Sequence, residues 1–143
     1  MAGKTTTWAN DLLKLVFQST PVANLADNAA TSPLTNLYIS LHTADPGVAG
    51  AQNTSEAAYT GYARVAVARS AVGWTVTGNS VSPAATIVFP AATAGSETET
   101  FWGIGVAATG AGTLLYSGSI TPGIAVSNGV TPELTTSSTA TES

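Results

Sequence analysis

The sequence predicts a mainly β protein, an antiparallel β-sandwich or jelly-roll-like domain with one α-helix at its N-terminus. Three observations favour this fold class. Apolar residues recur with a helical period only near the N-terminus. From Leu37 onward they alternate with polar residues, as in half-buried strands. Glycine and proline turn signals then separate many short β-prone segments, which is typical of antiparallel sheets rather than of alternating strands and helices.

The N-terminal helix is expected from Trp8 to Gln18, with Thr6 or Thr7 able to cap it. Its apolar face is wide and comprises Trp8, Leu12, Leu13, Leu15, Val16 and Phe17. This width leaves two alternatives: the whole face packs on its own domain, or part of it contacts another subunit. The connection from Pro21 to Pro33 is expected to be irregular.

Strands are expected at 37–42, 62–69, 73–77, 86–89, 101–107 and 113–120, with a weaker one at 123–127. Turns are expected between them, at Gly78-Asn79, 108–112, Pro122-Gly123 and Asn128-Gly129 among others. Glycines alternate with larger residues around Gly103 and Gly105, which predicts a strand with one bare face for a large ring or another backbone.

The chain is expected to form a single domain with three parts. Residues 1–36 provide the helix and a connecting arm, and residues 37–130 form the β-sandwich. The tail at 131–143 is rich in Thr and Ser, and we expect it to frame the sheet as an edge strand or to lie on a neighbour.

The composition argues against several classes of partner. Only 8% of the residues are charged and the net charge is -4, so there is no basic surface for nucleic acid. No apolar window has the length of a membrane span, and we expect a soluble protein made in the cytoplasm. The chain has no cysteine for a thiolate or a disulfide. Because few like charges oppose association, this surface is typical of a subunit that packs against others.

The segment LHTADPG holds His42, the only histidine, beside Asp45. His42 could act as a general base if a carboxylate oriented it and a nucleophile lay in reach. No nucleophile motif or metal-ligand set accompanies it, so we predict a structural histidine whose ring bonds backbone or water. The sequence predicts no catalytic, cofactor or metal site and no enzyme activity.

The rest of the segment predicts a turn. Asp45 can bond the backbone beyond it, Pro46 fixes φ and Gly47 permits a positive φ. Arg64 follows on a strand with Ala and Val neighbours, where an unpaired charge would be costly. We therefore predict a carboxylate partner for Arg64, either Asp45 or Glu56.

The order of motifs LYISLHTADPG, GYARV, IVFP and GTLLYSGSI resembles a family of small virion proteins of tailed bacteriophages. Members carry labels such as tail fibre, head decoration or cement protein. The likeness extends from the N-terminal helix to about Val130, and the Thr/Ser-rich tail departs from the more apolar closing strand expected there. The resemblance implies a structural role in the virion, without catalytic residues to carry over.

The leading hypothesis is a capsid decoration or cement protein that binds the assembled head as a homo-oligomer, by analogy a trimer, and contacts the major capsid protein or other virion proteins. Binding to the assembled shell would stabilise that shell by mass action. A tail-associated or tail-fibre protein is the alternative. A carbohydrate-binding module, with Trp74, Trp102 or Tyr59 as a stacking platform, is the alternative from another class. The expected contact surface comprises Trp8, Leu12, Leu15, Phe17 and the loop from Asp45 to Glu56.

Overall fold

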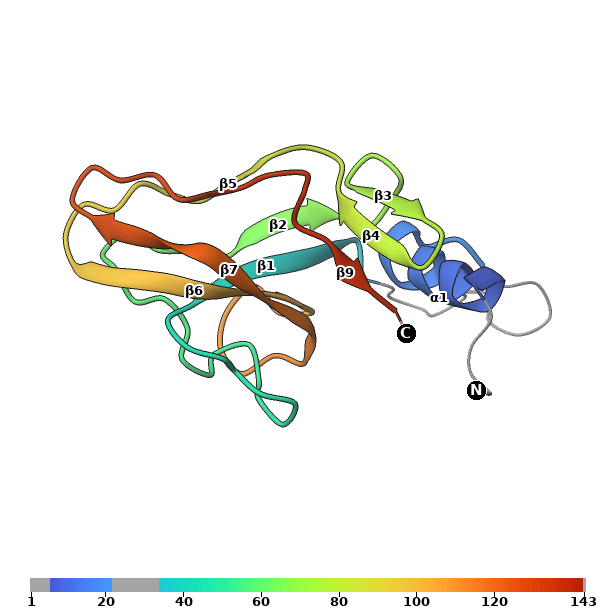
Figure 1. Cartoon of the computed structure of the whole chain (residues 1–143), viewed down its shortest axis with the longest axis horizontal. Helices are drawn as coiled ribbons and strands as arrows, with labels where there is room; N and C mark the ends of the chain where they lie inside the picture. The colour runs from blue at the N-terminus through green and yellow to red at the C-terminus, as the bar shows by residue number, and fades with distance from the viewer. Residues whose placement is uncertain (1–5, 22–33, 143) are drawn as a thin grey trace. The chain divides into compact units, whose positions relative to one another are not determined.

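The computed structural model describes residues 6–21 and 34–142, with the backbone alone at 6–8. It is mainly β with one N-terminal helix, as predicted (Figure 1). The elements in chain order are α1 (Thr6–Gln18), β1 (Asn36–His42), β2 (Val65–Ala68), β3 (Trp74–Thr77), β4 (Ser80–Pro83), β5 (Ile87–Val88), β6 (Ser96–Gly105), β7 (Leu114–Ser127), β8 (Glu133–Leu134) and β9 (Ala140–Thr141). The expected connection from 22 to 33 lies outside the described residues.

The residues group into two compact units. The first unit combines Met1–Asn36, Val67–Thr86 and Thr135–Ser143, and the second combines Leu37–Ala66 and Ile87–Leu134. The helix therefore shares a unit with β3, β4 and β9, which come from the middle and the end of the chain. Long-range packing, rather than consecutive stretches of sequence, defines the units.

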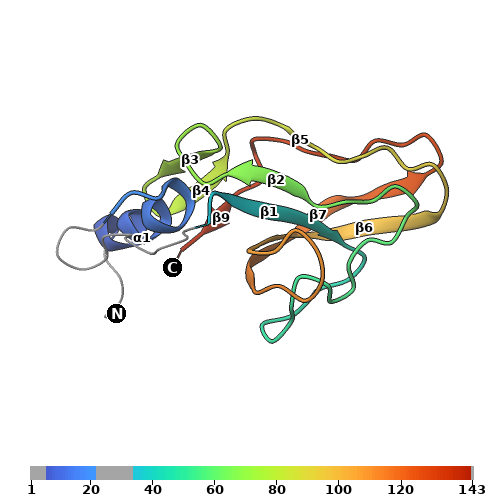
Figure 2. The same cartoon turned by 180° about the vertical axis from the view of Figure 1, so that it is seen from behind.

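In the first unit, α1 packs beside β3 and β4 (Figures 1 and 2). Its buried stripe is Ala9, Leu13 and Phe17, at the i, i+4 and i+8 spacing of one helix face. The Phe17 ring packs edge-on against the ring of Trp74, with 4.7 Å between the ring centroids. Aromatic pairs prefer this arrangement. The helix starts at Thr6, so Thr6 and Thr7 are its first residues rather than its caps.

The end of α1 is fixed by polar contacts within the same unit. Ser19 adopts a φ of +55°, a left-handed conformation that commonly ends helices. The Arg69 guanidinium donates to the carbonyl oxygens of Leu15 at 2.6 Å, Val16, and Leu34 at 3.3 Å. Carbonyls of a last helical turn lack partners inside the helix, so this arginine supplies the missing donors.

The turn predicted at Gly78-Asn79 joins β3 and β4 into a hairpin in which Thr77 pairs with Ser80. The strand β4 itself was not expected from the sequence, because its residues SVSP have little apolar content. Val81 and Pro83 are buried there, while Ser80 and Ser82 are half-buried. The C-terminal strand β9 adds to the other side of β4, with Val81 opposite Ala140.

A four-stranded sheet has the order β2-β1-β6-β7, and most of its residues belong to the second unit; Val67 and Ala68 of β2 are grouped with the first. The β1–β6 and β6–β7 pairs are antiparallel, and Ile39 lies opposite Ile104 in the first of them. The strand β6 begins at Ser96, earlier than expected, because Glu97 and Glu99 lie in the ladder although acidic residues are uncommon in strands. The strand β7 continues past Pro122-Gly123, where a turn was predicted, but its pairing with β6 is irregular there: Ser119 lies opposite Phe101 and Ile124 lies opposite Glu99.

The C-terminal tail frames the sheets, which is one of the two placements expected for it. Ile87 in β5 pairs with Leu134 in β8, within the second unit. In the first unit, the hydroxyls of Ser80 and Thr141 lie 3.1 Å apart, and the Asn79 side chain donates to the Glu142 carbonyl at 3.1 Å. Leu134 and Ala140 are the buried apolar residues that anchor these short pairings.

Candidate functional site

The loop that follows β1 starts with a tight turn. Asp45 Oδ1 accepts a hydrogen bond from the Gly47 N–H at 2.8 Å. Gly47 has a φ of +71°, which glycine adopts without strain. A Cβ atom at Gly50 would lie 2.1 Å from the Pro46 carbonyl oxygen, so the chain folds back too closely for any other residue. The turn directs the loop away from β1 at the place that the sequence indicated.

Glu56 is the carboxylate partner of Arg64, and Asp45 instead bonds its own turn. The guanidinium Nε donates to Glu56 Oε1 at 2.6 Å, and Nη2 donates to Oε2 at 2.7 Å. The Arg64 side chain is 2% exposed and that of Glu56 is 16% exposed. The hydrogen bonds to Glu56 raise the pKa of Arg64. A two-point pair of this kind fixes geometry as well as charge.

Further hydrogen bonds extend the pair to neighbouring segments of the second unit. Arg64 Nη1 donates to the Ala107 carbonyl at 2.8 Å, and Nη2 donates to the Gly110 carbonyl at 2.7 Å. The Tyr62 hydroxyl donates to Glu56 Oε1 at 2.9 Å and accepts from the Leu41 N–H at 3.1 Å. Burial, and then the Glu56 carboxylate, raise the pKa of Tyr62. This cluster fastens the loop after β1, the start of β2 and the loop after β6 to one another.

His42 is a fully buried residue at the end of β1. Its Nδ1 lies 2.8 Å from the Thr54 carbonyl oxygen, which can only accept, so Nδ1 carries the proton. In the neutral ring, Nε2 then accepts from the Ser40 hydroxyl at 2.9 Å. Burial lowers the pKa of His42. The Nδ1 bond holds the loop against β1, the Nε2 bond stays within β1, and neither nitrogen is hydrogen-bonded to a carboxylate that would orient a catalytic base.

Gln52 is a second internal anchor of the loop, and the sequence analysis missed it. It is fully buried; its Nε2 donates to the Ala107 carbonyl at 3.2 Å, and its Oε1 accepts from the Ala107 N–H at 2.9 Å. A Cβ at Gly105 would lie 2.1 Å from Gln52 Cδ, and one at Gly112 would lie 2.2 Å from Oε1. The bare strand face predicted at Gly103 and Gly105 therefore accommodates the Gln52 amide at Gly105.

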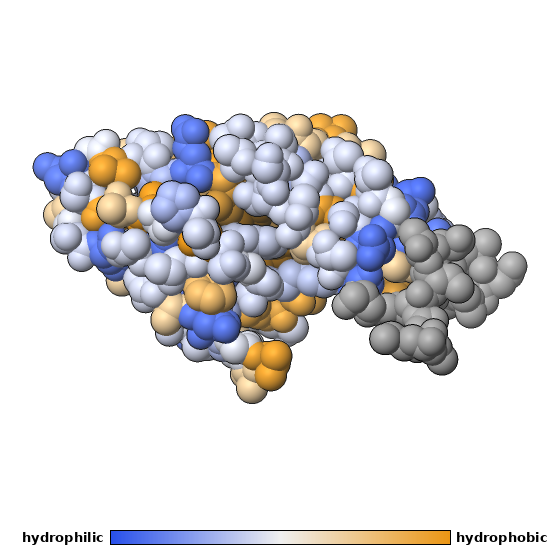
Figure 3. All heavy atoms as spheres, viewed as in Figure 1, coloured by the Kyte–Doolittle hydropathy of each residue, from blue (hydrophilic) through white to orange (hydrophobic). Residues whose placement is uncertain are grey.

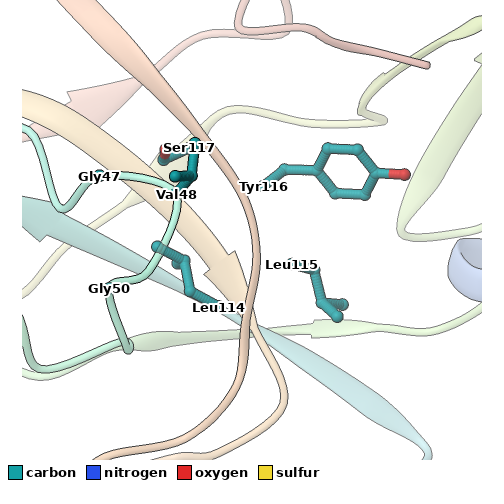
Figure 4. Close-up of a pocket in the computed structure, with 7 residues that line it drawn as sticks. All are labelled: Gly47, Val48, Gly50, Leu114, Leu115, Tyr116 and Ser117. Atoms are coloured by element: carbon teal, nitrogen blue, oxygen red, sulfur yellow. The ribbon is translucent and has the colours of Figure 1, made fainter. Parts of the chain in front are cut away.

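Two hollows flank Val48, at the tip of the same loop, and both are bordered by β7. One, of about 320 Å³, is lined by Gly47, Val48, Gly50 and Leu114–Ser117 (Figure 4). The other, of about 460 Å³, is lined by Asp45, Gly47, Val48, Phe101 and Ser117–Ser119. Leu114 and Ser117 extend toward the side of Val48, whereas Leu115 and Tyr116 extend away from it. Val48 itself is fully exposed, as an apolar side chain on a well-anchored loop.

The predicted helix contacts divide into two groups. Leu12 and Leu15 are half-buried, and Phe17 is completely buried against Trp74. Phe17 is therefore a core residue of the first unit, and the expectation that it contacts another subunit is wrong. It lies one turn beyond Leu13, on the face that the unit itself covers. The Trp8 side chain lies outside the described residues.

The aromatic residues considered for sugar stacking are internal. Trp74 is 1% exposed, Tyr59 is 3% exposed and Trp102 is 7% exposed. The Trp102 ring lies over Gly118, where a Cβ would be 2.8 Å from ring atoms. Stacking on a sugar requires an open ring face. These three residues therefore do not provide the platform that a carbohydrate-binding module needs.

Neither a cluster of metal ligands nor a membrane-spanning helix is found among the described residues. Among residues 6–21 and 34–142, no three His, Asp or Glu side chains come together as metal ligands would. Within the described part of the chain, no helix has the length and apolar character needed to cross a membrane. What the second unit presents instead is a rigidly anchored loop with an apolar tip, beside the last strand of a sheet.

Comparison with protein families indicates the kind of protein that carries this loop. The chain matches, over residues 3–142, the family described as Podophage GP4 fiber I protein gp80. The chain belongs to this fibre protein family. No curated protein matches the chain. Membership makes it a structural protein of a bacteriophage virion, as the motif resemblance implied, and the fibre description fits the tail-fibre alternative better than capsid decoration.

Proposed function

We propose that this fibre family member is a structural subunit of a podophage tail fibre, which acts by binding copies of itself and other virion proteins. The family match over nearly the whole chain carries the proposal. The tail-fibre proposal replaces capsid decoration as the leading hypothesis. The role is one of assembly rather than of catalysis.

The surface of the protein supports this role. Figure 3 shows the strongly hydrophilic residues of one face as separate patches on a surface of mostly intermediate hydropathy. Only 8% of the residues are charged. When another protein covers such a surface, few charged side chains lose their hydration. The free-energy cost of forming the contact is therefore lower.

The contact surface that we propose is the tip of the loop after β1, with the half-buried helix residues Leu12 and Leu15 as a second candidate. Val48 is fully exposed, while Glu56, His42 and Gln52 hold the loop from inside. A preorganised loop loses little conformational entropy on binding. Glu56, expected from the sequence to make contacts, contributes through this anchoring. Three copies around one axis remain the expected stoichiometry, by analogy with the motif resemblance.

Electron cryomicroscopy of the intact particle tests the location. Density for this fold in the fibres supports the proposal, and density confined to the head lattice would reject it in favour of decoration. Val48→Asp tests the loop tip, because a charge there would have to be desolvated at the contact. We expect this variant to be incorporated into particles at a reduced level. The matched control is Val72→Asp, at a valine that is 85% exposed in the first unit.

A further inference from the structure

The turn between β7 and β8 holds Asn128-Gly129, the single place in the sequence where glycine follows asparagine. The Val130 N–H donates to the Ser127 carbonyl at 2.9 Å and closes a four-residue turn. Gly129 has a φ of +87°, whereas the φ of Asn128 is not positive. A positive φ at the third residue alone defines a type II turn, with Asn128 and Gly129 as its central residues.

An Asn-Gly pair can modify itself, since asparagine is among the chemically labile residues of proteins. The Gly129 backbone nitrogen gives its proton to water and attacks Cγ of Asn128. The new N–Cγ bond closes a five-membered succinimide, the bond from Cγ to the side-chain nitrogen breaks, and that nitrogen leaves as ammonia. Water then opens the ring at either carbonyl and yields aspartate or isoaspartate. Glycine has no Cβ to hinder the attack, and both residues are exposed to the water that the reaction needs.

The backbone of the folded turn opposes ring closure. The five-membered ring forms only when the Cβ of Asn128 is nearly eclipsed with the Gly129 nitrogen about the Cα–C bond. A type II turn holds the ψ of its first central residue at about +120°. In an L-residue this ψ rotates Cβ far from the following nitrogen, so the turn must open before the ring can close.

The attacking nitrogen is also occupied in the folded protein. The Gly129 N–H donates to the Ala92 carbonyl at 2.7 Å, and the Ala92 N–H donates in return to the Val130 carbonyl at 2.8 Å. Ala92 is only 1% exposed, so water does not easily replace these bonds. Removing the proton from Gly129 therefore requires the two segments to separate first.

We propose that Asn128-Gly129 is a deamidation site that the fold suppresses, and that it reacts only when the turn opens and Gly129 leaves Ala92. The rate in the folded protein is then the rate of the open chain multiplied by the fraction of time that the turn is open. Isoaspartate adds a methylene group to the backbone, so the product cannot restore both bonds to Ala92. This chemistry belongs to the chain itself and does not depend on the proposed fibre role.

The opening can be measured independently of the reaction. Mass spectrometry of peptides gives the deamidation rate of the folded full-length protein and of the same protein unfolded in urea, at one pH and temperature. Hydrogen exchange of the Gly129 N–H, followed by NMR, gives the open fraction. We expect deamidation to be at least about tenfold slower in the folded protein, by the same factor as the exchange. Urea below the unfolding transition should raise both rates together, and Asn128→Gln, which would have to close a larger ring, should remove the reaction.

Three results would overturn the proposal: equal deamidation rates in the folded and unfolded protein, a slowing that does not follow the exchange of Gly129, or faster deamidation of another asparagine in the unfolded chain. The product provides a second test, because anion exchange separates the deamidated fraction by its added charge. We expect its isoaspartate form to lose protection of the Ala92 N–H from exchange. Asn128→Asp is the matched control, with the same charge on a normal backbone, and should retain that protection. Unchanged protection in the isoaspartate form would show that the bonds to Ala92 do not restrain the site.

Discussion

The guanidinium of Arg64 and the carboxylate of Glu56 form a two-point ion pair, with Nε 2.6 Å from Oε1 and Nη2 2.7 Å from Oε2. The pair lies at the junction of three segments, because Arg64 also bonds the carbonyls of Ala107 and Gly110. Buried pairs of this kind add little net stability compared with apolar residues, but breaking one leaves an uncompensated charge. The pair therefore specifies where the loop lies.

Glu56→Gln should lower the free energy of unfolding by about 3 kcal/mol, because the buried guanidinium of Arg64 would lose its counter-charge. Urea denaturation at neutral pH measures the change. Asp45→Asn is the matched control, since it makes the same acid-to-amide change on an exposed residue whose oxygen can still accept from Gly47. We expect that control to stay within about 0.5 kcal/mol of the wild type. Equal losses in the two variants would mean that the ion pair has no special role.

His42 should make the protein sensitive to mild acid. Burial lowers its pKa below the ordinary value of 6.5, so in the pH range between its folded and unfolded pKa values the unfolded chain binds more protons. The stability due to neutral His42 is complete above about pH 6.5 and declines as the pH falls toward the folded pKa. His42→Gln keeps an N–H donor for Thr54 but does not titrate. We expect the difference in unfolding free energy between pH 7.5 and pH 5 to be smaller in this variant, and an equally steep loss in both proteins would exclude His42 as its source.

Much of the fold could be predicted because its elements have local signals. The helix has a 3.6-residue period, β1 carries an apolar-polar alternation at its start, and Gly78-Asn79 has the chemistry of a hairpin turn. The strand β4 was missed, and β8 and β9 were expected only as a tail that frames the sheet, without bounds or partners. These three strands contain few apolar residues and form because tertiary neighbours pair with them, which no local pattern records.

A contact within the site could be predicted from the sequence where a charged side chain on a strand required a partner of opposite charge. Arg64 needed a carboxylate, and only the structure could choose Glu56 over Asp45. The burial of Gln52 could not be predicted in this way, because an uncharged amide in a polar loop does not require a partner. Its two hydrogen bonds are to Ala107, which is distant in the sequence. Gly103 and Gly105 predicted that another group lies close to the strand, but the sequence did not indicate which group. Phe17 was assigned to a contact surface because the sequence does not tell which part of a wide apolar face its own unit covers.

Gly105→Ala tests the close fit around Gln52. The added Cβ would lie 2.1 Å from Gln52 Cδ, so the amide must move and lose its two bonds to Ala107. We expect a loss of about 2 kcal/mol in the free energy of unfolding, as for other overpacked sites. In a Gln52→Ala background the obstacle is absent, so the same glycine substitution should cost much less. Additive losses in the double variant would mean that Gly105 is needed for another reason.

Glu97 and Glu99 lie two residues apart on β6, so their side chains share one face of the strand. Glu97 Oε1 accepts the N–H groups of Ala58 and Tyr59, both at 2.8 Å. Glu99 is completely buried, and neither of its carboxyl oxygens has a hydrogen-bond partner among the described residues. Burial, and then the neighbouring Glu97, raise the pKa of Glu99 to about 8. Glu99 therefore holds its proton to a higher pH than an ordinary carboxyl group does.

Stability should consequently decline as the pH rises. Between the ordinary pKa of 4.5 and the folded pKa of about 8, the folded protein holds a proton on Glu99 that the unfolded chain has lost. The contribution of protonated Glu99 is complete below pH 4.5 and is lost as the pH rises through about 8. Tyr59 faces the same carboxyls, but its pKa is raised to about 12 by burial, Glu99 and Glu97, so it does not titrate in this range.

Glu99→Gln replaces the protonated acid by an uncharged amide of the same size. We expect this variant to keep its stability between pH 6 and pH 9 and to exceed the wild type at pH 9, as measured by thermal unfolding across that range. Glu133→Gln removes an exposed carboxylate from β8 and should follow the wild type at every pH. A wild type whose stability does not fall between pH 6 and pH 9 would mean that Glu99 is already ionised in the folded protein, with a counter-charge supplied by another part of the chain.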